Sequence, residues 1–359
     1  MSIYKDTERN TWYVVTPYTD YDGKKKQKKK RGFKTKREAQ IWENDFLVMH
    51  QKDVTLLFKA LAEHYLKDEK QHLKPSTYET KVIIISTHIL PYFADMAVSD
   101  ITPLEIRKWQ NKLKKATTKR GTSLSQSYIH SINTILCTIF NHAIKFYGLK
   151  ENPCSIAGSV GSPKPKQEMS IWTVEQFNHF LKYEDDPIYK MAFILFFYTG
   201  MRKGELLALE WGDIDFNNKV INITKSLQRI RGKDVVTSPK TSKSERTIVI
   251  FDNLIEILKK YKSFVYDDSE RSRVFPTLNS SNLYRRLKKK AKEADLNEIR
   301  IHDLRHSHAS LLIELGFSPL VIADRLGHES VQTTLDRYSH LYPNKQQELA
   351  DKLQEISIK

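Results

Sequence analysis

The sequence predicts a mainly α-helical protein with small antiparallel sheets, an α+β chain built from several domains. Residues 53–155 contain four segments whose apolar residues recur every three or four positions, which is the spacing of one helix face. Residues 11–18 and 219–250 are instead rich in the β-branched and aromatic residues of strands. The 359 residues also exceed what one compact core usually organises.

Charge and composition restrict the class of partner. The formal net charge of +16 and the pI near 9.5 favour a polyanion, with nucleic acid ahead of an anionic membrane. We expect no membrane association, because no segment approaches the roughly 20 apolar residues of a membrane span and the start lacks the apolar core of a signal peptide. Cys137 and Cys154 are too few for a disulfide framework. A cytoplasmic protein is therefore expected.

Residues 1–50 combine strand patterns, a basic run and one helix. In Lys24–Arg31, seven of eight residues are basic. Such a run is often a solvated tail, but its position between Tyr13–Tyr18 and Phe33 favours a basic hairpin on a small sheet. Thr35 is then the expected N-cap of a helix. The apolar face of that helix would consist of Ala39, Trp42, Phe46 and Leu47.

Residues 53–155 predict a helical domain, and Thr102 before Pro103 marks one helix start. Lys119 and Arg120 lie in a basic segment that joins two of the helices and could contact a DNA backbone. The Pro-, Gly- and Ser-rich sequence that follows breaks the helical periodicity. We therefore expect a linker at residues 156–169.

Residues 170–343 begin with a helix from Asp186 and Pro187 to Gly200, with Arg202 near the start of the next helix. A bound anion would suit the arginine there, but taken alone the position favours a surface salt bridge to Glu205. Residues 219–230, 233–239 and 245–250 predict a three-stranded antiparallel sheet. Lys240 lies in the loop between the second and third of these strands. Its side chain is either simply solvated or reaches into a cleft as a proton donor.

The segment "RIHDLRHSHASLLIELG" predicts a helix with His302 and Arg305 on one face. His302 and His306 have the spacing of a zinc-binding pair. However, the sequence carries Asp303 where zinc proteases carry glutamate, and Arg305 is a poor neighbour for a cation. A metal site is therefore disfavoured.

A pair of tyrosines lies near the end of this region. A short helix should run from Ser318 and Pro319 to Gly327, with His328 in the turn. Ser330 is the expected cap of a further helix that continues to Pro343. Tyr338 would then lie two turns into that helix, and Tyr342 at its frayed end.

Five segments in order, "TGMRKGELLALEW", "PKTSKSERTI", "HDLRHSHAS", "LGHES" and "TTLDRYSH", resemble the catalytic domain of the tyrosine recombinases, the phage integrase family. The layout is similar to three-domain integrases. It implies an arm-site DNA-binding domain at 1–50, a SAM-like core-binding domain at 53–155 and a catalytic domain at 170–343. The apolar helix face in tail 344–359 would pack on a neighbouring protomer.

The resemblance implies that Tyr338 attacks a DNA phosphodiester and forms a 3′-phosphotyrosine. Arg202 and Arg305 would hold the non-bridging oxygens, and Glu205 would support them. Lys240 would protonate the leaving 5′-oxygen.

Four histidines nearby receive different assignments from the same resemblance. His302 would take part in proton transfer with the nucleophile, and His328 would hydrogen-bond the phosphate. His306 and His308 have no implied role beyond packing or backbone contacts.

The implied function is integration and excision of a mobile element, without metal or ATP. The partners would be double-stranded DNA with core-type and arm-type attachment sites, three further copies of the chain, a host DNA-bending protein and an excisionase. A type IB topoisomerase and a non-catalytic DNA-binding protein are the alternatives. The candidate DNA-contacting residues are Lys24, Lys25, Lys26, Lys28, Lys29, Lys30, Arg31, Lys119 and Arg120.

Overall fold

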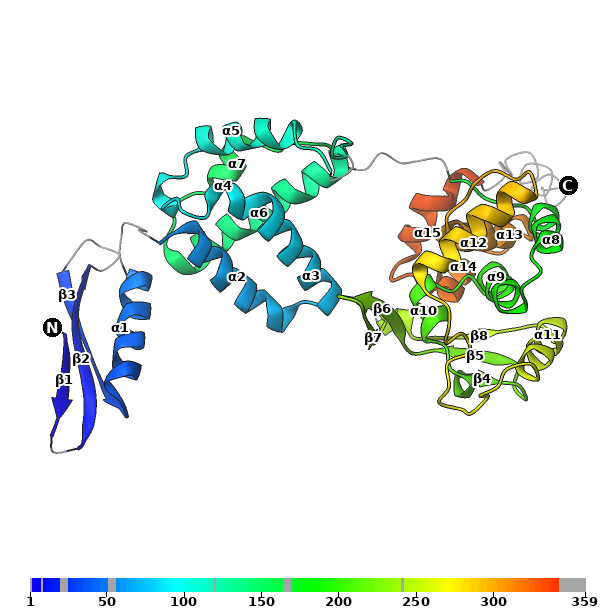
Figure 1. The fold of residues 1–359 in the computed structure, drawn as a ribbon, viewed down its shortest axis with the longest axis horizontal. Coiled ribbons are helices and arrows are strands. Elements are labelled where there is room, and N and C mark those ends of the chain that lie inside the picture. The colour runs from blue at the N-terminus through cyan, green and yellow to red at the C-terminus, as the bar shows by residue number, and fades with distance from the viewer. Residues whose placement is uncertain are drawn as a thin grey trace, which may run out of the picture. The chain divides into compact units, whose positions relative to one another are not determined.

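The computed structural model describes residues 2–7, 9–19, 25–50, 56–118, 121–163, 169–239 and 242–341 (Figure 1). The chain divides into two compact units, Met1–Lys166 and Gln167–Lys359. Each unit has a hydrophobic core of its own. Within the described ranges, no helix combines the length and the apolarity that crossing a bilayer requires.

The first unit begins with a three-stranded antiparallel sheet and a helix packed on it (Figure 1). These elements are β1 (Ile3–Asp6), β2 (Thr11–Thr19), β3 (Lys25–Phe33) and α1 (Lys36–His50). Val14 of β2 and Ala39 of α1 are fully buried between them. Thr35 caps α1, since its hydroxyl accepts a hydrogen bond from the Glu38 amide at 3.1 Å. The predicted small sheet is confirmed, and the basic run forms its strand β3, paired with β2.

A helical bundle follows in the same unit. Its elements are α2 (Phe58–His72), α3 (Pro75–Ile84), the π-helix η1 (Ile85–Ile89), α4 (Leu90–Phe93), the 3-10 helix η2 (Val98–Asp100), α5 (Pro103–Lys114), α6 (Gln126–Tyr147) and α7 (Pro153–Ala157). The ring of Phe58 packs on those of Phe93 and Phe140, with centroids 5.5 and 5.7 Å apart. Thr102 caps α5 as expected.

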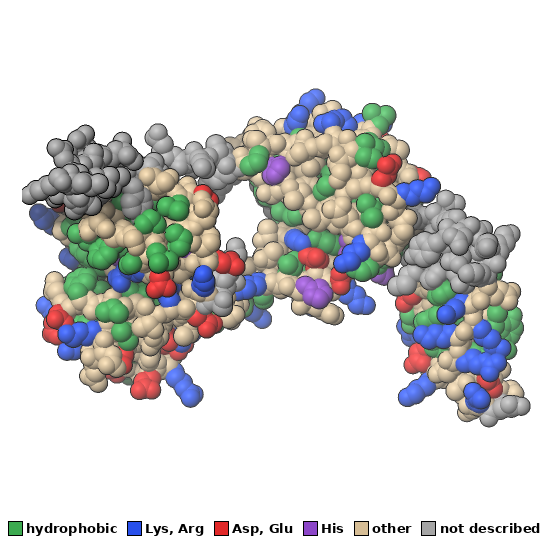
Figure 2. Space-filling view, turned by 180° about the vertical axis from the view of Figure 1, so that it is seen from behind, with side chains coloured by type: hydrophobic (Ala, Val, Ile, Leu, Met, Phe, Trp, Pro, Cys, Tyr) green, Lys and Arg blue, Asp and Glu red, His purple; other side chains and the backbone are tan. Residues whose placement is uncertain are grey.

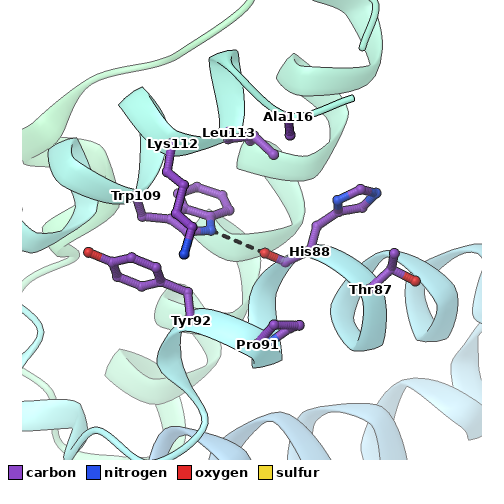
Figure 3. Close-up of a pocket in the computed structure, with 8 residues that line it drawn as sticks. All are labelled: Thr87, His88, Pro91, Tyr92, Trp109, Lys112, Leu113 and Ala116. Carbon is purple, nitrogen blue, oxygen red and sulfur yellow. Dashed lines mark hydrogen bonds between the residues drawn. The ribbon is translucent and has the colours of Figure 1, made fainter. Parts of the chain in front are cut away.

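A shallow pocket of about 160 Å³ marks the contact between α5 and the π-helix (Figure 3). There the indole of Trp109 donates a hydrogen bond to the backbone carbonyl of His88 at 3.1 Å. The core of this unit continues beyond α6, because Ala157 and Val160 are buried in it. The first residues of the expected linker 156–169 are therefore packed, and 164–168 lie outside the described residues.

The second unit surrounds a core of helices with two small sheets at its edge (Figure 1). Its helices are α8 (Val174–Tyr183), α9 (Pro187–Thr199), α10 (Lys203–Ala208), η3 (Trp211–Asp213), η4 (Ser242–Ser244), α11 (Asp252–Lys262), α12 (Ser280–Glu293), α13 (Ile301–Glu314), α14 (Pro319–Leu326), α15 (Val331–Tyr338) and η5 (Ser339–Leu341). Its strands are β4 (Ile214–Asp215), β5 (Val220–Ile223), β6 (Ser226–Ile230), β7 (Lys233–Thr237) and β8 (Arg246–Val249).

The strand pairing differs from the prediction. Residues 219–230 form two strands, since the chain breaks between β5 and β6 at Lys225, whose ammonium pairs with Asp213 at 3.1 Å. Strand β5 then pairs with β4 and β8, while β6 and β7 form a separate hairpin. The predicted single sheet of three consecutive strands is thus wrong.

Most of the predicted helix ends are confirmed in this unit. Asp186 accepts from two backbone amides at the start of α9, and Gly200 ends that helix with φ +66°. Ser318 caps α14, and Gly327 ends it. At α15 the prediction is wrong in two respects. Ser330 occupies the N-cap position without capping, and the α-helix ends at Tyr338, where a 3-10 turn follows.

Candidate active site

Arg202 and Glu205 are hydrogen-bonded to each other at the junction between α9 and α10. The Glu205 carboxylate accepts hydrogen bonds from the Arg202 amide and from Nη1 of its guanidinium, both at 2.8 Å. The Arg202 side chain remains 34% exposed, whereas that of Glu205 is 2% exposed. The expected salt bridge is present, and it leaves part of the arginine open to a ligand.

Arg246 at the start of β8 holds the same carboxylate and was missed by sequence reasoning. Its Nη1 and Nη2 donate to the two Glu205 oxygens at 3.2 and 3.0 Å. Burial alone would raise the pKa of Glu205, but Arg246 and Arg202 outweigh it and lower the pKa to about 2. A single arginine in a strand has no local signal that could have identified this contact.

Three arginines converge on the carboxyl end of α14. Arg246 Nε donates to the carbonyl of residue 325 at 2.8 Å, Arg305 Nη2 to that of residue 326 at 2.6 Å, and Arg202 Nη2 to that of residue 327 at 2.8 Å. The last carbonyls of a helix lack intrahelical partners and carry the negative end of the helix dipole. The end of α14 thereby gathers the positive charges of the site.

Arg305 is the most enclosed of these arginines, with 2% of its side chain exposed. Its Nη1 also donates to the Gly200 carbonyl at 2.7 Å, so it spans the ends of α9 and α14. Burial and the neighbouring Arg202 lower the pKa of Arg305 to about 9. The guanidinium therefore remains protonated at neutral pH.

His328 follows directly after Gly327 in the turn to α15, as predicted. Its Nδ1 lies 2.7 Å from the hydroxyl of Thr334, which is fully buried. Burial, Arg305 and Arg202 lower the pKa of His328 to about 3, so the ring is neutral at pH 7. A neutral imidazole held at Nδ1 keeps its second ring nitrogen for another hydrogen bond.

Tyr338 is the last residue of α15, and its side chain is fully buried. Its hydroxyl lies 2.7 Å from Nδ1 of His306 on α13. Burial raises the pKa of Tyr338 to about 12, although Arg305 and Arg337 act in the opposite direction. The structure thus pairs the expected nucleophile with a histidine to which the sequence assigned only packing.

The other two histidines of α13 have different surroundings. His302, one turn before His306, is exposed, and its ring meets that of His306 edge-on with centroids 4.8 Å apart. His308 is buried on another side, where its Nε2 accepts from Arg325 Nε at 3.0 Å. Among the described residues, no group of His, Cys, Asp and Glu side chains is placed to hold a metal ion.

Several predicted residues lie outside the described residues. They are Lys24, Lys119, Arg120, Lys240, Tyr342 and the tail 344–359. For Lys25 and Lys26 the structure describes only the backbone, which belongs to β3.

The remaining basic residues of β3 divide between the two faces of the sheet. The Lys29 ammonium and the Arg31 guanidinium lie over the ring of Tyr13, at 4.9 and 5.8 Å from its centroid. Lys30 points to the opposite face, where its ammonium lies 4.9 Å from the Trp42 ring of α1. Lys and Arg side chains gather on this part of the molecule in Figure 2. Since α1 covers one face, Tyr13, Lys29 and Arg31 form the open basic face.

Comparison with known proteins covers nearly the whole chain. Three family models match consecutive ranges: an arm DNA-binding domain at residues 2–48, the N-terminal SAM-like domain of phage integrases at 57–114, and the phage integrase family at 169–345. The ICEBs1 integrase of Bacillus subtilis is 35% identical over 328 residues, which is 85% of each chain. The chain belongs to the phage integrase family. It is thus a tyrosine recombinase, a class of enzyme that catalyses site-specific DNA recombination.

Other family members share the arrangement at lower identity. The integrase of Staphylococcus phage L54a is 27% identical over 350 residues, covering 84% of this chain and 94% of that protein. A Tn1549 transposon integrase solved with circular intermediate DNA has a TM-score of 0.62 at 18% identity and covers 83% of this chain and 99% of its own. A lambda integrase dimer bound to a core site has a TM-score of 0.59 at 18% identity, covering 96% and 97%. These structures establish the integrase fold of the chain.

Proposed function

We propose that this tyrosine recombinase integrates and excises a mobile element by cutting DNA with Tyr338 and holding the cut strand as a 3′-phosphotyrosine. The observation that carries the proposal is the convergence of Arg202, Arg246 and Arg305 on the turn that leads to α15, the helix that ends with Tyr338. Cations and a potential oxygen nucleophile thus meet in one unit of the chain. The transesterification conserves bond energy, so it requires neither ATP nor a metal.

Arg202 and Arg305 would bind the non-bridging oxygens of the scissile phosphate. A planar guanidinium matches a phosphate with two parallel hydrogen bonds and stabilises the charge that grows as phosphorus becomes pentavalent. Glu205 supports this role because it fixes the Arg202 side chain through Nη1. Lysine at either position would lose the forked geometry.

The remaining roles concern protons and the phosphate. Lys240 would protonate the departing 5′-oxygen as a general acid. His328 would donate a hydrogen bond to the phosphate from the ring nitrogen that Thr334 leaves free. His302 would take part in proton transfer with the nucleophile through the cluster that it forms with His306.

The rest of the chain would select and hold the DNA. Residues 1–50 would bind arm-type sites through the open face of the sheet, and residues 53–155 would bind core-type sites. Residues 156–169 would join them to the catalytic domain at 170–343. The tail 344–359 would pack on a neighbouring protomer, so that four copies assemble on the recombining DNA. A lambda integrase tetramer bound to a Holliday junction has a TM-score of 0.57 to this chain.

We also propose the setting of the reaction. The enzyme would act in the cytoplasm of a bacterial cell on double-stranded attachment sites. A host DNA-bending protein and an excisionase would set its direction.

The test uses a core duplex, defined as a double-stranded DNA recovered from a randomised pool by its SDS-resistant adduct with the wild-type chain. The duplex is nicked near the mapped cleavage point, so that the cut strand diffuses away. We expect Tyr338→Phe to lose the adduct and Tyr342→Phe to keep it, with duplex binding unchanged in both. An adduct that survives Tyr338→Phe but not Tyr342→Phe would overturn the assignment.

A further inference from the structure

Among the residues that the structure describes, the titratable side chain at hydrogen-bonding distance from the Tyr338 hydroxyl is that of His306. The Oη and Nδ1 atoms lie 2.7 Å apart, and the two rings meet edge-on with centroids separated by 5.6 Å. Tyr338 is fully buried and His306 is 7% exposed. Water is therefore poorly placed to remove the tyrosine proton.

His306 has the protonation state that a proton acceptor needs. Burial lowers the pKa of His306 to about 4, so the ring is neutral at pH 7. A neutral imidazole has one unprotonated nitrogen, and Nδ1 takes that role when the tyrosine O–H donates to it. The charged and titratable groups around the ring are Asp303, Arg337, Arg305, Arg300, His302 and Tyr338.

The tyrosine cannot rely on ionising by itself. With a pKa of about 12, roughly one molecule in 10⁵ would carry the phenolate at pH 7. His302 meets His306 edge-on, and within the described part of the chain its ring is adjacent to His306 rather than hydrogen-bonded to the tyrosine. The acceptor in contact with the hydroxyl in the described part of the chain is thus one turn further along α13 than His302, to which the sequence resemblance assigned proton transfer.

We infer that His306 is a catalytic residue, the general base that takes the proton of Tyr338 as the phosphodiester is attacked. The inference rests on the proposed function, in which Tyr338 is the nucleophile. The Oη–phosphorus bond forms while the bond from phosphorus to the 5′-oxygen breaks. The tyrosine proton moves to Nδ1, and the 5′-oxygen receives a proton from Lys240. Rejoining reverses both transfers, so the imidazolium returns its proton to the departing tyrosine oxygen.

The charges of the site fit this transfer. The transferred proton creates an imidazolium beside Arg305 and Arg337, which disfavour it, and Asp303, which favours it. A bound phosphate adds negative charge next to the same arginines and makes the ring more basic. The part of His302 in this proton transfer is then indirect: it is a positioning residue, because its ring packs against that of His306.

The experiment compares variants on the core duplex with a 5′-bridging phosphorothiolate at the cleavage point. A thiolate leaves without protonation, so the rate of adduct formation no longer depends on Lys240. His306→Asn keeps a hydrogen-bonding amide near the position of Nδ1 but cannot take a proton. His179→Asn changes an exposed histidine of α8 and is the matched control.

We expect the wild type and His179→Asn to form adduct at a rate that is constant from pH 6 to 8. His306→Asn should be at least 100-fold slower at pH 7, as is typical for the loss of a general base. Its rate should then rise about tenfold per pH unit, because only pre-formed phenolate reacts. Imidazole added to His306→Ala should restore part of the rate, whereas Lys240→Ala should be rescued by the thiolate alone.

Three results would overturn the inference. One is a His306→Asn rate close to that of the wild type, which would limit His306 to positioning. Another is the steep pH profile in His302→Asn instead. The third is a wild-type rate of adduct formation that rises tenfold per pH unit. This result would exclude a general base even if His306→Asn fails to fold. An adduct that persists in Tyr338→Phe would instead contradict the proposed function.

Discussion

Glu205 is the residue on which the geometry of the arginines depends. Its carboxylate is 2% exposed and accepts hydrogen bonds from both Arg202 and Arg246. Arg246 is itself only 6% exposed, so it has little access to water as an alternative partner. Removal of one partner from a buried ion pair costs about 3–5 kcal/mol, because the remaining charge is left uncompensated.

Glu205→Gln should therefore lower the free energy of unfolding of the second unit by about 3 kcal/mol at pH 7. Urea unfolding followed by tryptophan fluorescence measures this change. Glu329→Gln, at an exposed position on the turn to α15, should change it by less than about 0.5 kcal/mol. Equal stabilities of the two variants would contradict a structural role for Glu205.

The same carboxylate makes stability depend on acid. Its pKa is about 2 in the folded protein and 4.5 without the fold. Since the folded pKa is depressed, the stabilisation is complete above about pH 4.5 and is lost as the pH falls toward 2. This lowering of the Glu205 pKa corresponds to a contribution of about 3 kcal/mol to the free energy of unfolding. The stability difference between the wild type and Glu205→Gln should thus shrink between pH 5 and 2.5, and a constant difference would count against it.

Single residues also show which contacts of the site could be predicted from the sequence and which could not. Arg202 and Glu205 are three positions apart at a helix start, so their pairing could be anticipated from spacing alone. Arg246 is 41 positions from Glu205, and His306 is 32 positions from Tyr338. Such contacts exist only because β8 packs near α10 and α13 near α15, and a single sequence carries no signal for that packing.

At the scale of elements, the turn after α9 controls how closely the helices approach. Gly200 has φ +66°, and a Cβ atom there would lie 2.6 Å from the His308 ring and 2.7 Å from the Leu326 side chain. Its carbonyl also accepts from Arg305. The residue is therefore fixed by both backbone conformation and packing.

Gly200→Ala should destabilise the second unit more than Gly232→Ala, by at least about 1 kcal/mol, and should also slow adduct formation on the core duplex. Gly232 in the β6–β7 turn has φ +79° and open space around its Cα, so it reports the backbone strain alone. Thermal unfolding of both variants makes the comparison. Similar losses at the two positions would show that the close approach to His308 and Leu326 is unimportant.

The basic strand β3 offers a matched comparison within one element. Lys29 and Arg31 lie on the open face with Tyr13, and Lys30 lies on the face covered by α1. Replacing both Lys29 and Arg31 with Gln should reduce the slope of log affinity against log salt by about 2, since each phosphate contact contributes about 0.9. Fluorescence anisotropy with a labelled duplex measures the slope. Lys30→Gln should change it by less than half as much per charge removed, and an equal effect would contradict the division of the faces.

Helix caps and strand pairing differ in how far they could be predicted from the sequence. The caps Thr35, Thr102, Asp186 and Ser318 were predictable, because each depends on a few neighbouring residues. The pairing of β5 with β8 was not, since it joins residues 220–223 to 246–249 across an intervening hairpin. Ser330 has the right residue type and position, but its hydroxyl lies near that of Thr333 instead of a backbone amide.

At the scale of the whole molecule, the proposed arm- and core-binding domains lie in one unit and the proposed catalytic residues in the other. The sheet and helical bundle belong to Met1–Lys166, and the arginines, His306 and Tyr338 belong to Gln167–Lys359. The order of domains stays a prediction, in which five short motifs carry the family resemblance of residues 170–343 and the layout of the chain carries the rest. The assembly on DNA depends on the proposed contact of the tail with another copy.

Deletion of residues 345–359 should abolish the synapsis of two DNA sites but leave the binding of one core duplex to one protomer within about twofold. Native gels and mass photometry distinguish the two complexes. Wild-type levels of recombination by the truncated chain would remove the proposed role of the tail. Failure to bind a single duplex would instead point to a role of the tail within its own protomer.

The carboxyl end of α14 bears on how the proposed site can serve both cutting and rejoining. In the free protein, Arg202, Arg246 and Arg305 already donate hydrogen bonds to three successive backbone carbonyls. The mutual repulsion of Arg202 and Arg305 is thus offset within the free protein itself. Under the proposed function, a DNA strand would meet the same group of arginines when it is cut and when it is rejoined. The site would then need no rearrangement of its arginines between the two steps, which suits a transesterification whose forward and reverse steps have similar energies.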